Sequence, residues 1–305
     1  MKPGILAMVT SLLLATLACG LISPSAPDQT GIATSVAATL QALAAANTPA
    51  PNVEILASPT SLPATAPTIP PTAQSGSPVS FQNVSFVIPA GLADGANNET
   101  VPEMNETNSA PWSIAPEHTL IKLTGYPITR EGFEPVIHIY PADQYFSVNP
   151  SAENSLSRLR AILASPTALL TNDKLSRIPF FNAAQLYAAQ ASRLKFKSGE
   201  GLRMISESAQ YPAPITSDLS YYHFEGLTFD GKYFIVAIFP VIVPLQATQE
   251  NPGADGITFP ADMADNTGFE TYYQAITERL NSASPESFQP ALTHLDALIQ
   301  SIQMK

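Results

Sequence analysis

Cysteine is almost absent from this chain: one residue, Cys19, occurs among 305. A single cysteine has no partner for a disulfide within the chain. Lysine and arginine are also few, 14 together against 25 aspartates and glutamates, so the formal net charge is −11. An acidic chain is repelled by the phosphates of nucleic acids and of anionic lipids. We therefore expect no nucleic-acid partner and no electrostatic attachment to a membrane.

The motifs of common nucleotide and catalytic sites are also missing. Gly199-Glu200-Gly201 has neither the third glycine nor the strand-to-helix context of a dinucleotide site. No serine stands in a Gly-x-Ser-x-Gly sequence, and no histidine spacing matches a zinc site. The sequence therefore predicts no cofactor.

The N-terminus has the features of a secretory signal. Lys2 supplies one positive charge, and an uncharged apolar run extends from Ile5 to Ala18. A short basic region, an apolar core and a small residue at the end are typical of such signals. This core is too short to span a bilayer as a helix.

The residues around Cys19 resemble the lipobox of bacterial lipoproteins. Ala18 is the small residue directly before the cysteine, although Thr16 stands where leucine is usual. The resemblance covers residues 1–20 and implies that residues 1–18 are removed. It also implies that Cys19 carries diacylglycerol on the outer side of the cytoplasmic membrane. Two acyl chains, at ~0.8 kcal/mol per buried CH₂, would anchor the protein there in effect permanently. The alternative is an ordinary secretory signal that happens to end near a cysteine.

Four segments follow from composition. Residues 1–18 form the signal, and residues 19–48 hold the anchor cysteine and a short Ala-rich helix predicted over 28–47. That helix either frays, lies on the bilayer or pairs with a partner helix. Residues 49–78 are rich in Pro, Thr and Ser and favour an extended linker. Residues 79–305 form the globular domain.

The pattern of the globular domain predicts an α+β fold on an antiparallel sheet. The predicted strands span 79–88, 119–123, 136–140, 193–197, 202–207, 220–229 and 232–240, and the predicted helices span 151–164, 269–280 and 285–304. Residues 183–191 are compatible with helix or strand, and residues 90–116 are predicted to be a long loop. Ser151 is the predicted cap of the first helix.

The best candidate for chemistry lies in the hairpin closed by Asp230-Gly231, a strong turn signal. A two-residue turn places His223 opposite Ile238 and Glu225 opposite Val236, with both polar residues on one face. Such a pair serves as an acid–base pair or as two metal ligands, or it is simply a partly buried hydrogen bond near the sheet end or a solvent-facing pair. Apolar residues on both faces indicate that the hairpin is covered on both sides.

Other candidates are weaker. Glu117 and His118 form a second His/Glu pair in a predicted loop, whereas His138 has the pattern of a core or edge histidine. Asp255, Asp262 and Asp265 suit either a calcium site or a soluble acidic loop. Aromatic residues near prolines or in pairs indicate either a glycan- or peptide-binding surface or anchors that hold loops on the core; they are Trp112, Tyr126, Tyr145, Tyr211 and Tyr272.

Three functions fit these observations. The first is a non-catalytic, lipid-anchored module of the cell envelope that binds a small molecule, a glycan or a protein. The second is a cell-surface hydrolase that uses His223 with Glu225, or His118 with Glu117. The third is a structural or assembly protein of the envelope.

Overall fold

The computed structural model describes residues 76–106, 109–167, 169–171, 174–175, 177–178 and 182–305. All described residues belong to one compact unit, Ile69–Lys305. Cys19, the predicted signal, the predicted helix over 28–47 and nearly all of the linker lie outside the described residues. Within the described ranges, no helix is long and apolar enough to cross a membrane.

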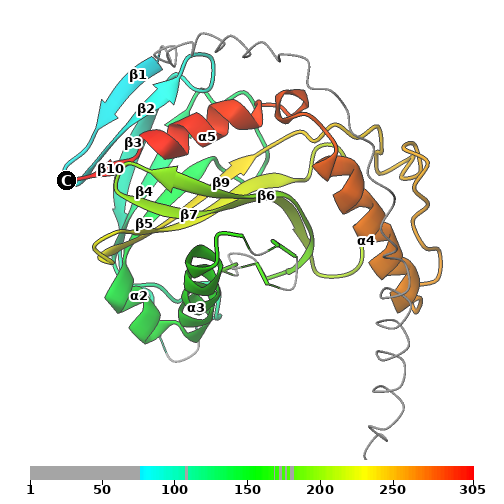
Figure 1. Ribbon diagram of the computed structural model, residues 1–305, viewed down its shortest axis with the longest axis horizontal. Coiled ribbons are helices and arrows are strands. Elements are labelled where there is room, and N and C mark those ends of the chain that lie inside the picture. The colour runs from blue at the N-terminus through cyan, green and yellow to red at the C-terminus, as the bar shows by residue number, and fades with distance from the viewer. Residues whose placement is uncertain (1–75, 107–108, 168, 172–173, 176, 179–181) are drawn as a thin grey trace, which may run out of the picture. The chain divides into compact units, whose positions relative to one another are not determined.

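The fold is α+β, as predicted, and its centre is a seven-stranded antiparallel sheet (Figure 1). The strand order is β3-β4-β5-β9-β8-β7-β6. The strands are β3 (Gly95–Val101), β4 (His118–Thr124), β5 (Val136–Pro141), β6 (Ala184–Phe196), β7 (Gly199–Ala209), β8 (Tyr221–Thr228) and β9 (Tyr233–Pro240). Residues 183–191, compatible with either state in sequence, thus belong almost entirely to a strand.

The register of the β8–β9 hairpin is the predicted one. His223 pairs with Ile238 and Glu225 with Val236. Gly231 adopts a positive φ of 73°, a conformation that glycine reaches without steric cost. Alternate residues of the hairpin therefore point to opposite faces of the sheet, and both faces are covered.

Helices cover the two faces of the sheet (Figure 1). Helices α2 (Ala142–Val148) and α3 (Pro150–Ala164) pack on the face that carries Phe234, Val236 and Ile238. Helices α4 (Asn266–Asn281) and α5 (Leu292–Ser301) contribute to the core of the opposite face. His223 and Glu225 thus lie on the α3 side of the sheet.

A second, three-stranded sheet has the order β1-β2-β10 and consists of β1 (Gly76–Ser80), β2 (Val84–Pro89) and β10 (Gln303–Met304). The predicted single strand over 79–88 is therefore wrong. The chain turns between Ser80 and Val84, where the amide of Phe81 donates to the carbonyl of Val84. The alternating pattern continues across the turn and does not reveal it.

Two further predictions are corrected. The predicted loop over 90–116 contains β3, whose polar, mostly exposed residues lack the pattern of a strand because it is an edge strand. The predicted helix over 285–304 is divided into the short 3₁₀ helix η1 (Pro285–Ser287), α5 and β10. Pro290 separates the first two, because proline has no amide hydrogen and its ring disfavours helix in the preceding residue.

The cap of α3 is Asn149 rather than the predicted Ser151. The Asn149 side-chain oxygen accepts hydrogen bonds from the amides of Ser151 and Ala152, at 2.9 and 3.2 Å. Its Nδ2 donates to the carbonyls of Pro111 and Ile114, at 3.1 and 2.8 Å. One buried asparagine therefore begins the helix and fixes a preceding loop against it.

Candidate functional site

The predicted pair of His223 and Glu225 forms a direct contact in the interior. His223 Nε2 lies 2.9 Å from Glu225 Oε1, and the two side chains are 6 % and 0 % exposed. Glu225 also accepts a hydrogen bond of 2.7 Å from Ser155 Oγ of α3 and one from the backbone amide of Ile178. One carboxylate thereby connects the sheet, a helix and a loop.

The surroundings of Glu225 favour its ionised form. Burial alone raises the pKa of a carboxyl group, but the hydrogen bonds from His223, Ser155 and Ile178 outweigh it, so the pKa of Glu225 is lowered. A carboxylate that accepts three hydrogen bonds is stabilised as an anion even without water. The negative charge of Glu225 is therefore compensated within the protein.

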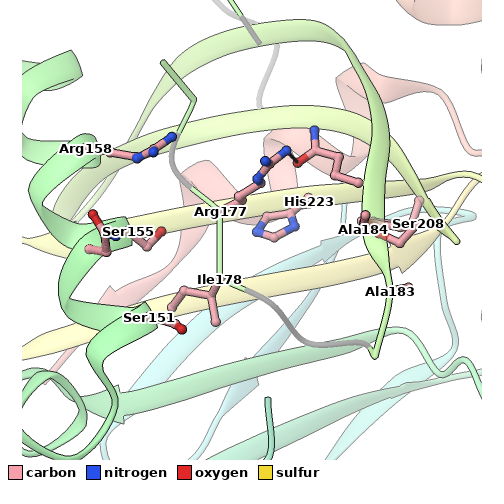
Figure 2. A pocket seen from close by; sticks show the side chains of 12 residues that line it. Ser151, Ser155, Arg158, Arg177, Ile178, Ala183, Ala184, Ser208 and His223 are labelled. Carbon is pink, nitrogen blue, oxygen red and sulfur yellow. Dashed lines mark hydrogen bonds between the residues drawn. The ribbon is translucent and has the colours of Figure 1, made fainter. Parts of the chain in front are cut away.

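A cavity of about 330 Å³ opens beside this cluster (Figure 2). Helix α3, the loop before β6, and strands β6, β7 and β8 form its wall. The lining residues are Ser151, Asn154, Ser155, Arg158, Arg177, Ile178, Ala183, Ala184, Gln185, Ser208, Tyr221 and His223. His223, a candidate predicted from the sequence, lines this cavity. The sequence pattern did not predict the cavity itself.

Helix α3 faces the cavity with a polar stripe. Its lining residues follow at positions 151, 154, 155 and 158, a spacing that places them on one face of a helix. The neighbouring stripe, which includes Ala152, Leu156 and Leu159, is buried in the protein. The helix therefore uses one stripe for the core and the adjacent one for the cavity.

The order of the polar contacts differs from that of a serine hydrolase. In a catalytic triad, histidine lies between the serine and the carboxylate and takes the serine proton. Here Glu225 lies between Ser155 and His223, and Ser155 donates directly to the carboxylate. This arrangement holds Ser155 and His223 in place and does not activate Ser155 as a nucleophile.

The second predicted pair is not brought together in the same way. Glu117 is exposed, whereas His118 is buried and contacts the Pro116 carbonyl through Nδ1 at 2.9 Å. His118 Nε2 lies 3.1 Å from His138 Nδ1. Burial lowers the pKa of both histidines, that of His138 to about 3, with the charge of His118 contributing to the shift at His138. His138 is thus a half-buried histidine on the interior strand β5.

The three acidic candidates for calcium hold backbone amides. Asp255 accepts from Gln246 and Ala247, Asp262 from Ala264, and Asp265 caps α4 by accepting from Gly268 at 2.8 Å. Among the described residues, no group of three or more histidine, cysteine or acidic side chains is arranged to hold a metal ion.

The aromatic candidates divide into two groups. Tyr126, Tyr145 and Tyr272 are buried and belong to the core, so they hold loops and helices in place. Trp112 and Tyr211 are 39 % and 68 % exposed.

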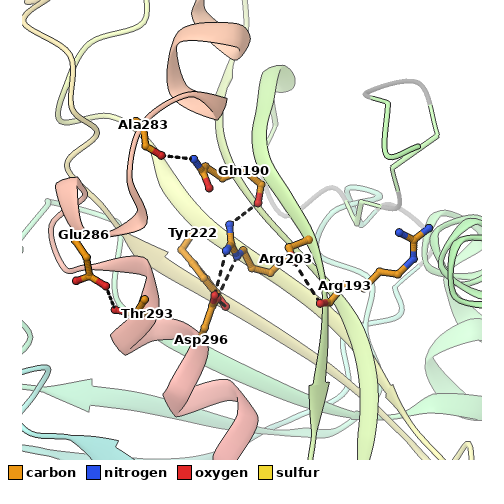
Figure 3. A network of polar contacts seen from close by, with 9 residues as sticks. Gln190, Arg193, Arg203, Tyr222, Ala283, Glu286, Thr293 and Asp296 are labelled. Carbon is orange, nitrogen blue, oxygen red and sulfur yellow. Dashed lines mark hydrogen bonds and ion pairs between the residues drawn. The ribbon is translucent and has the colours of Figure 1, made fainter. Parts of the chain in front are cut away.

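A polar network that the sequence did not indicate lies on the opposite face of the sheet (Figure 3). Arg203 contacts both carboxylate oxygens of Asp296, which also accepts a hydrogen bond from Tyr222. Arg203 donates in addition to the carbonyl of Gln190, a residue with a positive φ of 55° at an irregularity of β6. The side chain of Gln190 donates to the carbonyls of Leu280 and Ala283 at the end of α4.

A second unforeseen group is Glu207 of β7, which is 3 % exposed. Burial raises its pKa to about 8, although Ser220, which donates to it at 3.4 Å, and the charge of Arg130 act in the opposite direction. Buried groups with shifted pKa values are concentrated at functional sites, but they also occur in structural networks. Glu207 does not line the cavity beside His223.

A larger cavity of about 1040 Å³ lies between α4 and β6, and its wall includes Arg203, Glu270 and Glu278. Its charged lining residues are of both signs, whereas those described beside His223 are the two arginines Arg158 and Arg177.

No protein-family model, no curated protein and no solved structure matches this chain.

Proposed function

We propose that this protein is a lipid-anchored module on the outer side of the cytoplasmic membrane, and that its α+β domain binds a small ligand in the cavity beside His223. One observation carries the proposal of binding: polar side chains from five parts of the fold converge on a cavity of about 330 Å³. A concave site with a few convergent polar groups is typical of ligand binding. The membrane anchor rests on the resemblance of residues 1–20 to lipoprotein signals.

Binding without catalysis is favoured by the hydrogen bonds of the site. Ser155 and the Ile178 amide both donate to Glu225, and neither contact leaves a nucleophile activated by a base. These bonds join α3 and the loop before β6 to the central strand β8. The cluster therefore has the properties of a rigid support for the cavity wall.

A hydrolase is the second candidate, and one contact favours it. Glu225 binds one ring nitrogen of His223, and a carboxylate in that position orients a histidine that acts as a general base. Replacement of His223 would then abolish turnover while leaving ligand binding in place. In a binding module, the same replacement changes affinity alone.

The test is a thermal-unfolding screen of the full chain in detergent micelles with small metabolites, glycans and peptides. A ligand at 100 times its dissociation constant adds about 2.7 kcal/mol, which corresponds to roughly 5–10 °C for a domain of this size. The His223→Gln variant should lose most of that shift, whereas His294→Gln, a change in α5 away from the cavity, should keep it. A screen without any shift would contradict the proposal and would favour the third candidate, an envelope assembly protein, which crosslinking to a partner in intact cells would detect.

A further inference from the structure

We propose that the cavity beside His223 takes an anionic small molecule, whose phosphate or carboxylate group is bound by Arg158 and Arg177. This inference rests on the proposed binding function and specifies the ligand class. The described residues of the cavity wall differ in charge from the protein as a whole.

The chain as a whole is acidic, whereas the charged residues known to line this cavity are basic. Two of the chain's 14 lysines and arginines line this one cavity, together with His223, and the described residues of the wall include no aspartate or glutamate. The carboxylate of Glu225, which contacts Ser155 and His223 of the wall, is 0 % exposed and already accepts hydrogen bonds from His223, Ser155 and Ile178. The charged side chains among the described lining residues are therefore both arginines, within a protein whose net charge is −11.

The two arginines approach the cavity from different elements. Arg158 belongs to α3, and Arg177 to the loop before β6; both are exposed, whereas His223 is buried. In the view of Figure 2, both guanidinium groups are drawn above the His223 ring, with Arg158 farther to the left. Arginines at the mouth and a histidine at the base are suited to a ligand that enters with its charged group near the opening.

Arg177 is held in a defined orientation. Its Nη1 donates to Gln185 Oε1 at 3.1 Å, and Gln185 in turn donates through Nε2 to the Tyr187 carbonyl at 3.0 Å. A planar guanidinium offers five donors in a fixed fork that matches the oxygens of phosphate and carboxylate groups. An oriented guanidinium loses less conformational entropy when it binds such a group.

The remaining wall supplies hydroxyl donors and an apolar side. Ser151 and Asn154 belong to α3, and across the cavity Ser208 Oγ lies 2.7 Å from Tyr221 Oη. Ile178, Ala183 and Ala184 complete the wall with apolar surface. The volume of about 330 Å³ is at the lower end of the range for small-molecule sites. We therefore expect an anion with a compact apolar body rather than a polymer.

Titration calorimetry of the full chain in detergent micelles tests this inference. The probes are phenyl phosphate, benzoate and inorganic phosphate, with benzyl alcohol as the neutral counterpart. Arg158→Gln and Arg177→Gln should each weaken binding of an anion at least tenfold. The matched control is Arg160→Gln, which removes the same charge from an exposed position on the same helix outside the cavity wall; it should bind as the wild type does.

The outcomes separate this inference from the function on which it rests. Binding by phenyl phosphate alone or by benzoate alone identifies the oxyanion and supports the inference. Equal affinity of Arg158→Gln, Arg177→Gln and Arg160→Gln, or benzyl alcohol binding as tightly as the anions, would overturn it. If no anion binds but a neutral ligand from the wider screen binds through His223, the inference is overturned and the proposed function stands. If no ligand binds at all, both are overturned. Should a glutamine variant unfold, Arg158→Lys and Arg177→Lys keep the charge but lose the fork, and each should still bind more weakly than the Arg160 control.

Discussion

Arg203 of β7 donates through Nε and Nη2 to the two carboxylate oxygens of Asp296 in α5, at 3.1 and 3.0 Å. Tyr222 of β8 adds a hydrogen bond of 2.8 Å to Asp296 Oδ1. The side chains of Arg203 and Asp296 are only 7 % and 19 % exposed. A largely buried, bidentate ion pair thus links helix α5 to the central sheet.

Asp296→Asn should therefore destabilise the protein strongly. The change leaves the buried guanidinium of Arg203 without its counter-charge, which typically costs about 3–5 kcal/mol. Urea unfolding followed by circular dichroism measures the loss. Glu99→Gln is the control, because its ion pair with Lys122 is exposed and Glu134 also contacts Lys122; the unfolding midpoint should stay nearly unchanged. Equal midpoints for the two variants would show that the buried pair contributes little.

The contrast between this ion pair and the β8–β9 hairpin shows what the sequence could predict. The Asp230-Gly231 turn and the alternation around it are local, so they were sufficient to derive the pairing of His223 and Glu225 with β9. Arg203 and Asp296 are 93 residues apart, and Ser155 and Glu225 are 70 apart. No local pattern connects such residues, because their contacts arise only when helices dock on the sheet.

The edge strand β3 and the cap of α3 were missed for a different reason. The residues of β3 are polar, since an edge strand with little buried surface needs few apolar side chains. Asn149 and Ser151 are both good caps in sequence, and the choice between them depends on tertiary contacts of Asn149 with Pro111 and Ile114. The cavity could not be predicted either, because its lining residues come from separate segments that are brought together only in the folded chain.

Glu207 should make the stability of the protein depend on pH. Burial raises its pKa from 4.5 to about 8, so the folded state favours the neutral carboxyl group. The stabilisation is fully present below pH 4.5 and is lost as the pH rises toward 8. Glu207→Gln stays neutral at every pH. Above pH 8 its free energy of unfolding should therefore exceed that of the wild type by on the order of a few kcal/mol, as the size of the pKa shift implies.

The measurement for Glu207 is the free energy of unfolding in urea between pH 4 and pH 9, expressed as the difference between wild type and Glu207→Gln. Glu131→Gln removes the same charge from an exposed position and provides the reference curve. A difference that does not grow between pH 4.5 and pH 8 would show that Glu207 is ionised in the folded protein without cost.

Ser155→Ala should destabilise the protein through Glu225. Ser155 Oγ donates to the buried carboxylate at 2.7 Å, and loss of a hydrogen bond to a buried charged group costs about 1–3 kcal/mol. Ser157→Ala is a matched control on the same helix, because Ser157 is exposed. Urea unfolding should distinguish the two variants, and equal stabilities would mean that water replaces the serine at Glu225.

The lipid anchor is tested on Cys19, the single cysteine of the chain. The proposed lipoprotein should incorporate radiolabelled palmitate in bacterial cells, and mass spectrometry should find a mature chain that begins at a diacylglyceryl-modified Cys19. Cys19→Ala should lose the label, since no other thiol can carry the lipid. Because Cys19→Ala can retain its uncleaved signal peptide, it can stay in the membrane fraction. Cell fractionation alone therefore does not show whether Cys19 carries a lipid. An unlabelled wild-type chain, cleaved at another position, would instead identify an ordinary secretory signal, and the ligand-binding domain would then act free of the membrane.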